Sequence, residues 1–307
     1  MALLICATDR DTRPLAARVA ALAPDVEVRN WPDIGAPDDI EFAVLWRHPP
    51  GLLRSLGRLK AVSSLGAGVE HLVNEPELAD TIPIGRLAGP HLADDMSAYL
   101  IAQVLWHWRG LERFGPQQLA RQWKPWTPRH TPTIGLLGMG HLGQACARAL
   151  EALGLPVHGW SRSGQGPETV VMRQGTDGLR QLAAESDYLI CLLPLTQDTR
   201  GILNAGLFDS MKPGAVLINV GRGQHLVEAD LLAALENDRP ALAILDVFSS
   251  EPLDQKHPFW EHPKIRITPH CSAVTRSSEA AELIVRSYRQ VRAGLPPLGT
   301  VERERGY

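Results

Sequence analysis

Short hydrophobic runs alternate with helical or polar stretches along two consecutive parts of the chain. In the first part, strands are predicted at five apolar runs: 2–7, 26–31, 41–46, 60–65 and 82–87. In the second part, six further runs have the same character: 133–137, 156–160, 188–193, 215–220, 241–245 and 265–268. Apolar residues recur with helical spacing in four other stretches: 14–22, 93–113, 228–237 and 275–293. Apolar strands separated by helices are typical of parallel sheets covered on both faces, so the pattern predicts an α/β protein with two Rossmann-like, doubly wound parallel-sheet domains.

The last helical stretch, 275–293, follows the final strand of the second part of the chain. It can return to the first part, which would make the first domain discontinuous. A chain of 307 residues is long enough for two domains, each with its own core. We therefore expect one domain from residues 1–98 together with 276–307, and another from residues 99–275.

The composition excludes several classes of protein. Its 44% hydrophobic and 21% charged residues are typical of a soluble globular protein, and its net charge of −3 gives no reason to expect nucleic acid or an anionic membrane as a partner. No apolar run is long enough to span a bilayer, and the N-terminal residues lack the pattern of a secretory signal. Four cysteines lie far apart without a CxxC pair: Cys6, Cys146, Cys191 and Cys271. Such spacing favours free thiols over disulfides or a metal site, so we expect a cytoplasmic protein without a bound metal ion.

A glycine-rich turn follows the apolar run that opens the second part of the chain. The segment 133–143 reads TIGLLGMGHLG, and a helical pattern continues after it. In a strand–turn–helix unit of this kind, Gly138 permits the tight turn, Gly140 lets the backbone approach phosphate groups, and Gly143 allows close packing of the helix. The N-terminus of that helix also offers unpaired N–H groups to an anion. We therefore predict a site for a dinucleotide pyrophosphate here.

Four polar residues follow predicted strands of the second part: Arg222, Asp246, Glu251 and His270. Ligands of open parallel sheets bind beyond the carboxyl ends of the strands. Hydride transfer to a 2-oxo acid needs a cation for the carboxylate and carbonyl, which Arg222 can supply, and a proton donor, which His270 can supply. Glu251 can raise the pKa of His270 through its opposite charge. On the alternative interpretation, Arg222 is a solvated surface residue and Glu251 is a turn residue. For Asp246 two roles are open: it orients the nicotinamide or ribose, or it caps the next turn.

The choice of cofactor depends on the residues after the second strand of this unit. An NAD site usually has Asp or Glu about 20 residues beyond the first glycine, where it binds the ribose 2′-OH. This chain has the acid-free stretch 158–163, in which Arg162 lies between Ser161 and Ser163. These three residues can bind a 2′-phosphate, so NADPH is favoured and NADH is expected to bind more weakly. The alternative is that Arg162 is a solvated loop residue.

The motifs together resemble the D-isomer-specific 2-hydroxyacid dehydrogenases, over nearly the whole chain. The family motifs are the glycine turn, Asn219-Val220-Gly221-Arg222-Gly223, the stretch from Leu245 to Leu253, and Thr268-Pro269-His270. Further stretches are similar to the glyoxylate/hydroxypyruvate reductase group of that family: Trp46 with Pro49-Pro50, Ser64 to Val69, Trp160 to Ser163, Ala273 to Arg276, and Arg305-Gly306-Tyr307. One departure is Gly164-Gln165-Gly166, where that group usually has further basic residues, and it points to a weaker preference for NADPH.

The resemblance implies a function and a set of roles. It implies that Arg222 and His270 are catalytic, that Glu251 assists His270, and that the amides around Ala67 and Gly68 hold the substrate carboxylate. Trp46 is expected to line the pocket or to serve in packing. The first domain is expected to be flavodoxin-like and to bind substrate, and the second to be a dinucleotide-binding Rossmann domain. Further cofactor contacts are expected from these residues: His141, Leu142, Leu193, Pro194, Thr199, Val220, Gly221, Asp246 and Ser272.

The expected reaction is NADPH-dependent reduction of a small 2-oxo acid, glyoxylate to glycolate or hydroxypyruvate to D-glycerate. The resemblance also implies a homodimer formed through the helix at 93–113 and its neighbours. Two alternatives remain at this point. One is a dehydrogenase of a bulkier 2-oxo acid, and the other is a binding protein that senses NAD(P)H without catalysis.

Overall fold

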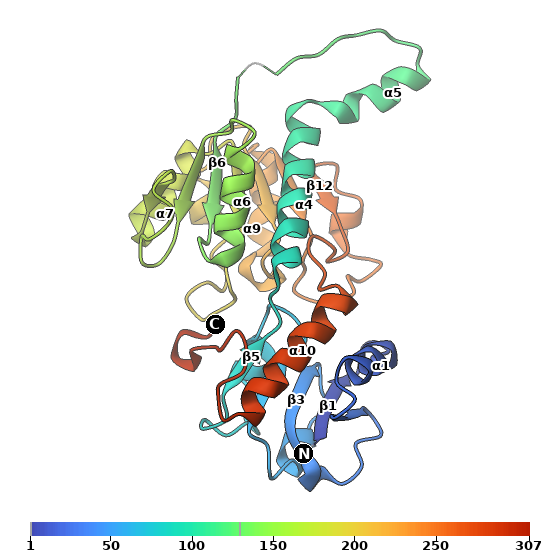
Figure 1. Cartoon of the computed structure of the whole chain (residues 1–307). Helices are drawn as coiled ribbons and strands as arrows, with labels where there is room; N and C mark the ends of the chain where they lie inside the picture. Colours follow the sequence, from blue (N-terminus) through green and yellow to red (C-terminus); the bar gives the residue numbers. More distant parts are fainter. Residues whose placement is uncertain (1, 129) are drawn as a thin grey trace. The chain divides into compact units, whose positions relative to one another are not determined.

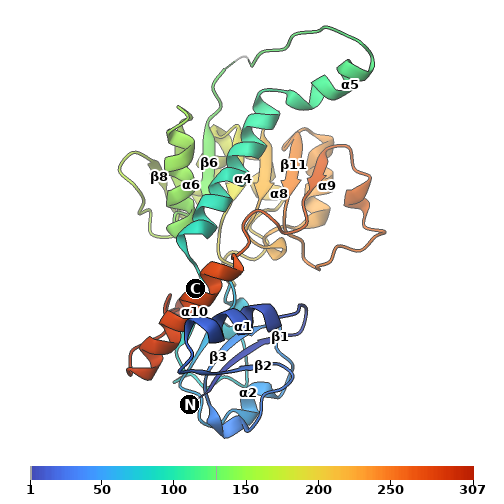
Figure 2. The same ribbon diagram turned by 45° about the vertical axis from the view of Figure 1, so that its right-hand side comes forward.

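The computed structural model describes residues 2–128 and 130–307, and the chain divides into two compact units. The first unit ends at Leu92 and resumes with Thr275–Tyr307, so it is discontinuous, as the order of the elements predicts. The second unit is Ala93–Val274. The boundary between the two units falls within helix α4, Pro90–Trp108. The boundary expected from the sequence, at residue 98, lies later in the same helix. Figures 1 and 2 show the two sheets with their helices.

The first unit is a five-stranded parallel sheet in the order β2-β1-β3-β4-β5, which is the flavodoxin-like order. Its strands are β1 Ala2–Ala7, β2 Glu27–Asn30, β3 Ile40–Trp46, β4 Ala61–Ser64 and β5 Ile84–Arg86. Alternate side chains of β1 face opposite sides of the sheet. Leu3 and Ile5 pack with the helices α1 (Arg13–Leu22) and α10 (Ser277–Arg292). Leu4 packs on the other side with α2 (Leu52–Ser55) and α3 (Glu70–Val73).

The second unit is a seven-stranded parallel sheet in the order β12-β11-β10-β9-β6-β7-β8. Its strands are β6 Ile134–Leu137, β7 Val157–Trp160, β8 Val171–Arg173, β9 Tyr188–Cys191, β10 Val216–Asn219, β11 Leu242–Leu245 and β12 Ile265–Ile267. One face is covered by α4 and α6 (His141–Glu151), and the other by α7 (Gly175–Glu185), α8 (Ala205–Phe208) and α9 (Glu228–Glu236). The strand order reverses between β6 and β9, and ligands of such sheets bind beyond the carboxyl ends of the strands at this point.

The structure corrects two local expectations. The helix predicted over 93–113 begins at Pro90, which suits the first turn of a helix, and ends at Trp108. Gly110 follows in a left-handed conformation with φ of 59°, and the chain continues as a short 3₁₀ turn and α5, Phe114–Leu119. Strand β8 was not predicted from the sequence; it contains Arg173, and its Val171 is 46% exposed, so it lacks the buried apolar character of most of the other strands.

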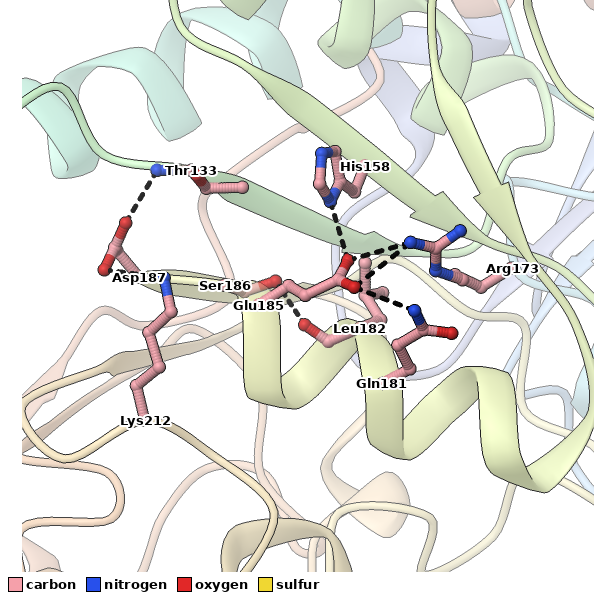
Figure 3. A network of polar contacts seen from close by, with 9 residues as sticks. All are labelled: Thr133, His158, Arg173, Gln181, Leu182, Glu185, Ser186, Asp187 and Lys212. Atoms are coloured by element: carbon pink, nitrogen blue, oxygen red, sulfur yellow. Dashed lines mark hydrogen bonds and ion pairs between the residues drawn. The ribbon is translucent and has the colours of Figure 1, made fainter.

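Polar contacts tie the elements together around the start of β9 (Figure 3). Asp187, which precedes β9, accepts the Thr133 amide at 2.8 Å and pairs with Lys212 at 3.2 Å. Glu185, at the end of α7, contacts three side chains from α7 and the neighbouring strands: His158, Arg173 and Gln181. Burial opposes the ionisation of Glu185, but the hydrogen bonds from Gln181 and Arg173 and the arginine charge outweigh it and lower its pKa. Asp187 and Glu185 both precede β9, so these contacts are centred before the amino end of that strand.

Three of the four cysteines, Cys6, Cys146 and Cys191, are buried free thiols, as their apolar surroundings in the sequence predict, and Cys271 is exposed. Burial raises the pKa of both the Cys6 and the Cys146 thiol to about 11. Within residues 2–128 and 130–307, the helices lack the combination of length and apolar character that crossing a lipid bilayer requires.

Candidate active site

The three candidate catalytic residues come from consecutive strands at one edge of the second sheet. Arg222 follows β10, Glu251 follows β11 and His270 follows β12. These strands are neighbours in the order β12-β11-β10, and all of them run parallel. Because carboxyl ends of parallel strands share one edge, the fold gathers residues that are far apart in the sequence.

His270 and Glu251 form a direct contact, with the imidazole Nδ1 2.7 Å from the carboxylate Oε2. The other carboxylate oxygen accepts the Phe248 amide at 2.9 Å, which fixes the orientation of Glu251. Burial opposes the ionisation of Glu251, but the two hydrogen bonds and the charges of His270 and Arg222 outweigh it and lower its pKa. The second ring nitrogen of His270, Nε2, has no hydrogen-bond partner among the residues described. It is therefore available to exchange a proton with a bound molecule.

The backbone of His270 is held in an unusual conformation by Asp246. His270 has a φ of 51°, in the left-handed region that non-glycine residues seldom adopt. Its amide donates to the Asp246 carbonyl at 2.8 Å. The fully buried Asp246 carboxylate accepts the amides of Cys271 and Ser272, at 3.0 and 2.9 Å, and the Thr268 hydroxyl at 2.5 Å. Asp246 therefore shapes the turn that carries His270. Of the roles expected from the sequence, these contacts match the capping of a turn more closely than the orientation of a nicotinamide or ribose.

Arg222 lies partly buried in the loop after β10. Its Nη1 donates to the Gly221 carbonyl at 2.7 Å, and its charge contributes to the low pKa of Glu251. The next residue, Gly223, touches the backbone of Phe248, and a Cβ built on Gly223 would lie only 1.8 Å from the Phe248 carbonyl carbon. The loop of Arg222 is thus packed directly against the loop that positions Glu251.

The glycine turn has the geometry that the motif predicts. Gly138 has a φ of 105°, which the missing Cβ permits. A Cβ on Gly143 would lie 1.9 Å from the Gly138 carbonyl oxygen, so α6 can pack this closely only with glycine there. Gly140 is the N-cap of α6, and nothing lies within 4 Å of the position its Cβ would take. The turn therefore leaves open space at a helix N-terminus, beside the point where the strand order reverses, which fits a pyrophosphate group.

The other candidate cofactor residues surround the same edge. Arg162 is exposed in the turn after β7, where the Ser161 hydroxyl donates to the Gln165 carbonyl at 3.0 Å. In the loop after β9, the Thr199 hydroxyl donates to the Pro194 carbonyl at 2.7 Å. The remaining candidates follow strand ends or open α6: His141, Leu142, Ser163, Leu193, Val220, Gly221 and Ser272. Their contact with a cofactor stays a prediction.

The candidate substrate residues Trp46, Ala67 and Gly68 belong to the first unit, at and beyond the carboxyl ends of β3 and β4. Trp46 packs edge-on against His71 with a centroid distance of 4.9 Å, and its indole Nε1 is buried without a hydrogen-bond partner in the described part of the chain. The amides of Ala67 and Gly68 likewise have no acceptor among the residues described. This loop therefore presents two backbone donors next to each other, as an anion site requires.

Sequence reasoning missed the residues that support Asp246. Thr268 donates its hydroxyl proton to Asp246, so it accepts from the Tyr99 hydroxyl, 2.7 Å away. Burial raises the pKa of Tyr99 to about 12, so the phenol keeps its proton. Thr268 was visible as part of the Thr268-Pro269-His270 motif, whereas Tyr99 lies within α4 and has no local signal.

Comparison with known proteins gives a consistent result. Residues 101–272 match the model of the D-isomer specific 2-hydroxyacid dehydrogenase, NAD binding domain. The glyoxylate/hydroxypyruvate reductase A of Serratia proteamaculans is 41% identical over 92% of this chain and 93% of its own length.

Two solved structures are also similar over the full chain. A D-isomer specific 2-hydroxyacid dehydrogenase from Xanthobacter autotrophicus, in complex with NADPH and MES, has a TM-score of 0.93 at 34% identity, covering 100% of this chain and 99% of its own. An NADPH-dependent glyoxylate/hydroxypyruvate reductase from Sinorhizobium meliloti, in complex with NADP and sulfate, has a TM-score of 0.92 at 34% identity and covers 100% of both chains. Motifs, fold and relatives agree, and the chain belongs to the D-isomer-specific 2-hydroxyacid dehydrogenase family.

Proposed function

We propose that this protein is an NADPH-dependent reductase of small 2-oxo acids, converting glyoxylate to glycolate and hydroxypyruvate to D-glycerate. The observation that carries the proposal is the 2.7 Å contact between His270 and Glu251, with Nε2 of the histidine available for proton transfer. Arg222 adds a guanidinium close enough to influence the Glu251 carboxylate. The names of the Serratia and Sinorhizobium relatives support the choice of substrates.

Each residue has a defined task in this reaction. The nicotinamide, when bound, supplies the hydride that attacks the carbonyl carbon of the 2-oxo acid. His270 donates its Nε2 proton to the carbonyl oxygen, and Glu251 stabilises the protonated imidazole that this step requires. Arg222 binds the substrate carboxylate and polarises the carbonyl through its forked guanidinium. In the first unit, the adjacent amides of Ala67 and Gly68 are donors that suit a carboxylate.

The same proposal assigns the cofactor to the second unit. The open turn at Gly140 and the N-terminus of α6 suit the pyrophosphate, and Arg162 with its flanking serines suits a 2′-phosphate. The first turn of α6 contains no acidic residue that would repel an anion. The NADPH and NADP complexes of the Xanthobacter and Sinorhizobium relatives support this preference.

We further propose that two copies form a homodimer through the arm, which we define as residues 111–128. Figures 1 and 2 both show α5 and the chain after it projecting from the body of the second unit. The ion pair between Glu112 and Arg266, at 2.7 Å, holds the base of the arm. Further along, Leu119 is 88% and Trp123 97% exposed, and such apolar side chains are typical of surfaces that a partner covers.

The compartment we propose is the cytoplasm. Its reducing conditions preserve the buried free thiols of Cys6, Cys146 and Cys191.

The substrate assignment can be tested by following NADPH oxidation with a panel of 2-oxo acids. Glyoxylate and hydroxypyruvate are expected to be reduced with higher kcat/KM than branched or aromatic 2-oxo acids. Arg222→Ala should lower kcat/KM at least about 100-fold, because a charged donor to the reacting group is lost. Arg180→Ala, an exposed arginine of α7, is the control and should keep wild-type kinetics. Higher kcat/KM on the bulky acids would overturn the substrate class, and tight NADPH binding without any turnover would point to a sensing protein.

The acid–base pair can be tested through the pH dependence of kcat. The lowered pKa of Glu251 keeps its carboxylate charged as the pH falls, so the negative charge beside His270 persists over the working range. Glu251→Gln removes that charge, and the alkaline limb of the kcat profile for reduction should therefore move to lower pH. His270→Ala should lower kcat about 100- to 10,000-fold with NADPH affinity retained. A Glu251→Gln profile identical to that of the wild type would contradict the pairing.

Cofactor preference can be tested at Arg162. Arg162→Ala should raise the KM for NADPH about tenfold or more, because a charge-assisted contact with the 2′-phosphate is lost. The KM for NADH should change less than about twofold, and Arg180→Ala again serves as the control. Equal effects of Arg162→Ala on both cofactors would remove the basis for the preference.

The arm can be tested by sedimentation of the wild type and two variants. The wild type should sediment as a dimer, and replacing Leu119 and Trp123 together by serine should shift it to a monomer. Trp260→Ser is the matched control, since this tryptophan is 51% exposed on a different part of the second unit and should leave the dimer intact. A monomeric wild type, or a dimer that survives the double change, would exclude the arm as the interface.

A further inference from the structure

His225 is a fully buried histidine that the proposed reaction does not use. It ends the short 3₁₀ turn Gly223–His225, three residues after Arg222, in the loop that follows β10. Its ring lies under the backbone of that loop and contacts two different segments of the second unit.

The imidazole links the loop of Arg222, after β10, to the loop after β9. Its Nδ1 is 3.0 Å from the Arg222 amide nitrogen, and its Nε2 is 3.2 Å from the Pro194 carbonyl oxygen. The Cys191 sulfur lies 3.7 Å from Nδ1. Pro194 also accepts the Thr199 hydroxyl at 2.7 Å, so its carbonyl is held from two sides.

These partners determine the protonation of the ring. A backbone amide can only donate a hydrogen bond and a carbonyl can only accept one. Nδ1 must therefore be unprotonated to accept from Arg222, and Nε2 must carry the proton that it donates to Pro194. The contacts select the neutral imidazole with its proton on Nε2.

The absence of a side chain at Gly221 leaves room for this ring. A Cβ on Gly221 would lie 2.9 Å from Nδ1 of His225 and 3.0 Å from the Leu193 carbonyl oxygen. A side chain at this position would push the imidazole away from Arg222. The backbone of His225 is also fixed, because its amide donates to the Arg222 carbonyl at 3.1 Å and its carbonyl accepts the Leu203 amide at 2.9 Å.

We propose that His225, as a neutral imidazole, is a positioning residue that sets the backbone of Arg222 for binding of the 2-oxo acid. The inference rests on the proposed role of Arg222 and adds a residue that the sequence motifs did not single out. Asn219 holds the carbonyl of Arg222, because its side-chain amide donates to that oxygen at 3.1 Å, and His225 supplies the acceptor for the Arg222 amide at the N-cap of the turn. A buried donor left without an acceptor is costly, and the loop would shift to relieve it.

Two substitutions separate the contacts of the ring. In His225→Asn, the side-chain oxygen takes the place of Nδ1 and can still accept from Arg222, but the contact with Pro194 is lost. In His225→Gln, the longer side chain can reach Pro194 but leaves the Arg222 amide without an acceptor. Both variants remove the imidazole from the core, so each controls for the other.

The KM for glyoxylate, with NADPH as cofactor, is the decisive measurement. His225→Gln should raise it about tenfold, while His225→Asn should restore it to within about threefold of the wild type. Dissociation constants for NADPH from fluorescence titration, together with melting temperatures, check that both variants are folded. Equal KM values in the two variants would overturn the proposal.

A second measurement does not depend on turnover. Long-range ¹H–¹⁵N correlation spectra of the wild type, assigned by comparison with His225→Asn, report which ring nitrogen carries the proton. We expect protonation of Nε2 alone. A proton on Nδ1 would overturn the positioning role of His225, even if the enzyme reduces glyoxylate. Failure of the wild type to reduce any 2-oxo acid would instead overturn the proposed function, and the spectra would still decide the protonation of His225.

Discussion

The carboxylate of Asp246 is the constraint on which the site depends. It is buried at the carboxyl end of β11 and satisfies the amides of Cys271 and Ser272 as well as the Thr268 hydroxyl. A buried carboxylate is tolerated only when its oxygens are hydrogen-bonded, so these groups must converge on it. Their convergence bends the chain after β12 and holds His270 at a φ of 51°. The contact of the imidazole with Glu251 follows from this bend.

A second set of contacts holds the loop of Arg222 against the loop of Glu251. Gly223 touches the backbone of Phe248, whose amide holds Glu251, and the Gln224 side chain donates to the Ser249 carbonyl at 3.1 Å. Arg222 and Glu251 therefore sit on loops packed directly against each other. Just before β9, Asp187 and Glu185 form the separate polar contacts of Figure 3, with the Thr133 amide that precedes β6 and with Arg173 of β8.

Much of this arrangement could be predicted from the sequence, because it depends on local patterns. Apolar runs located most strands, and the two sheets have the parallel, doubly wound form that the alternation of elements indicated. The meeting of His270 and Glu251 followed from their place after strands that share one edge. What could not be predicted depends on contacts over long separations in the chain. Tyr99 supports Thr268 from a helix 169 residues away, and His225 contacts Pro194 from 31 residues away, so neither leaves a local signal.

The division of the chain has a mechanical consequence. Arg222, Glu251 and His270 all belong to the continuous segment Ala93–Val274, and their loops contact one another within it. Any rigid displacement of the other unit leaves the 2.7 Å distance between His270 and Glu251 unchanged. The contact between His270 and Glu251 is therefore preorganised within the second unit.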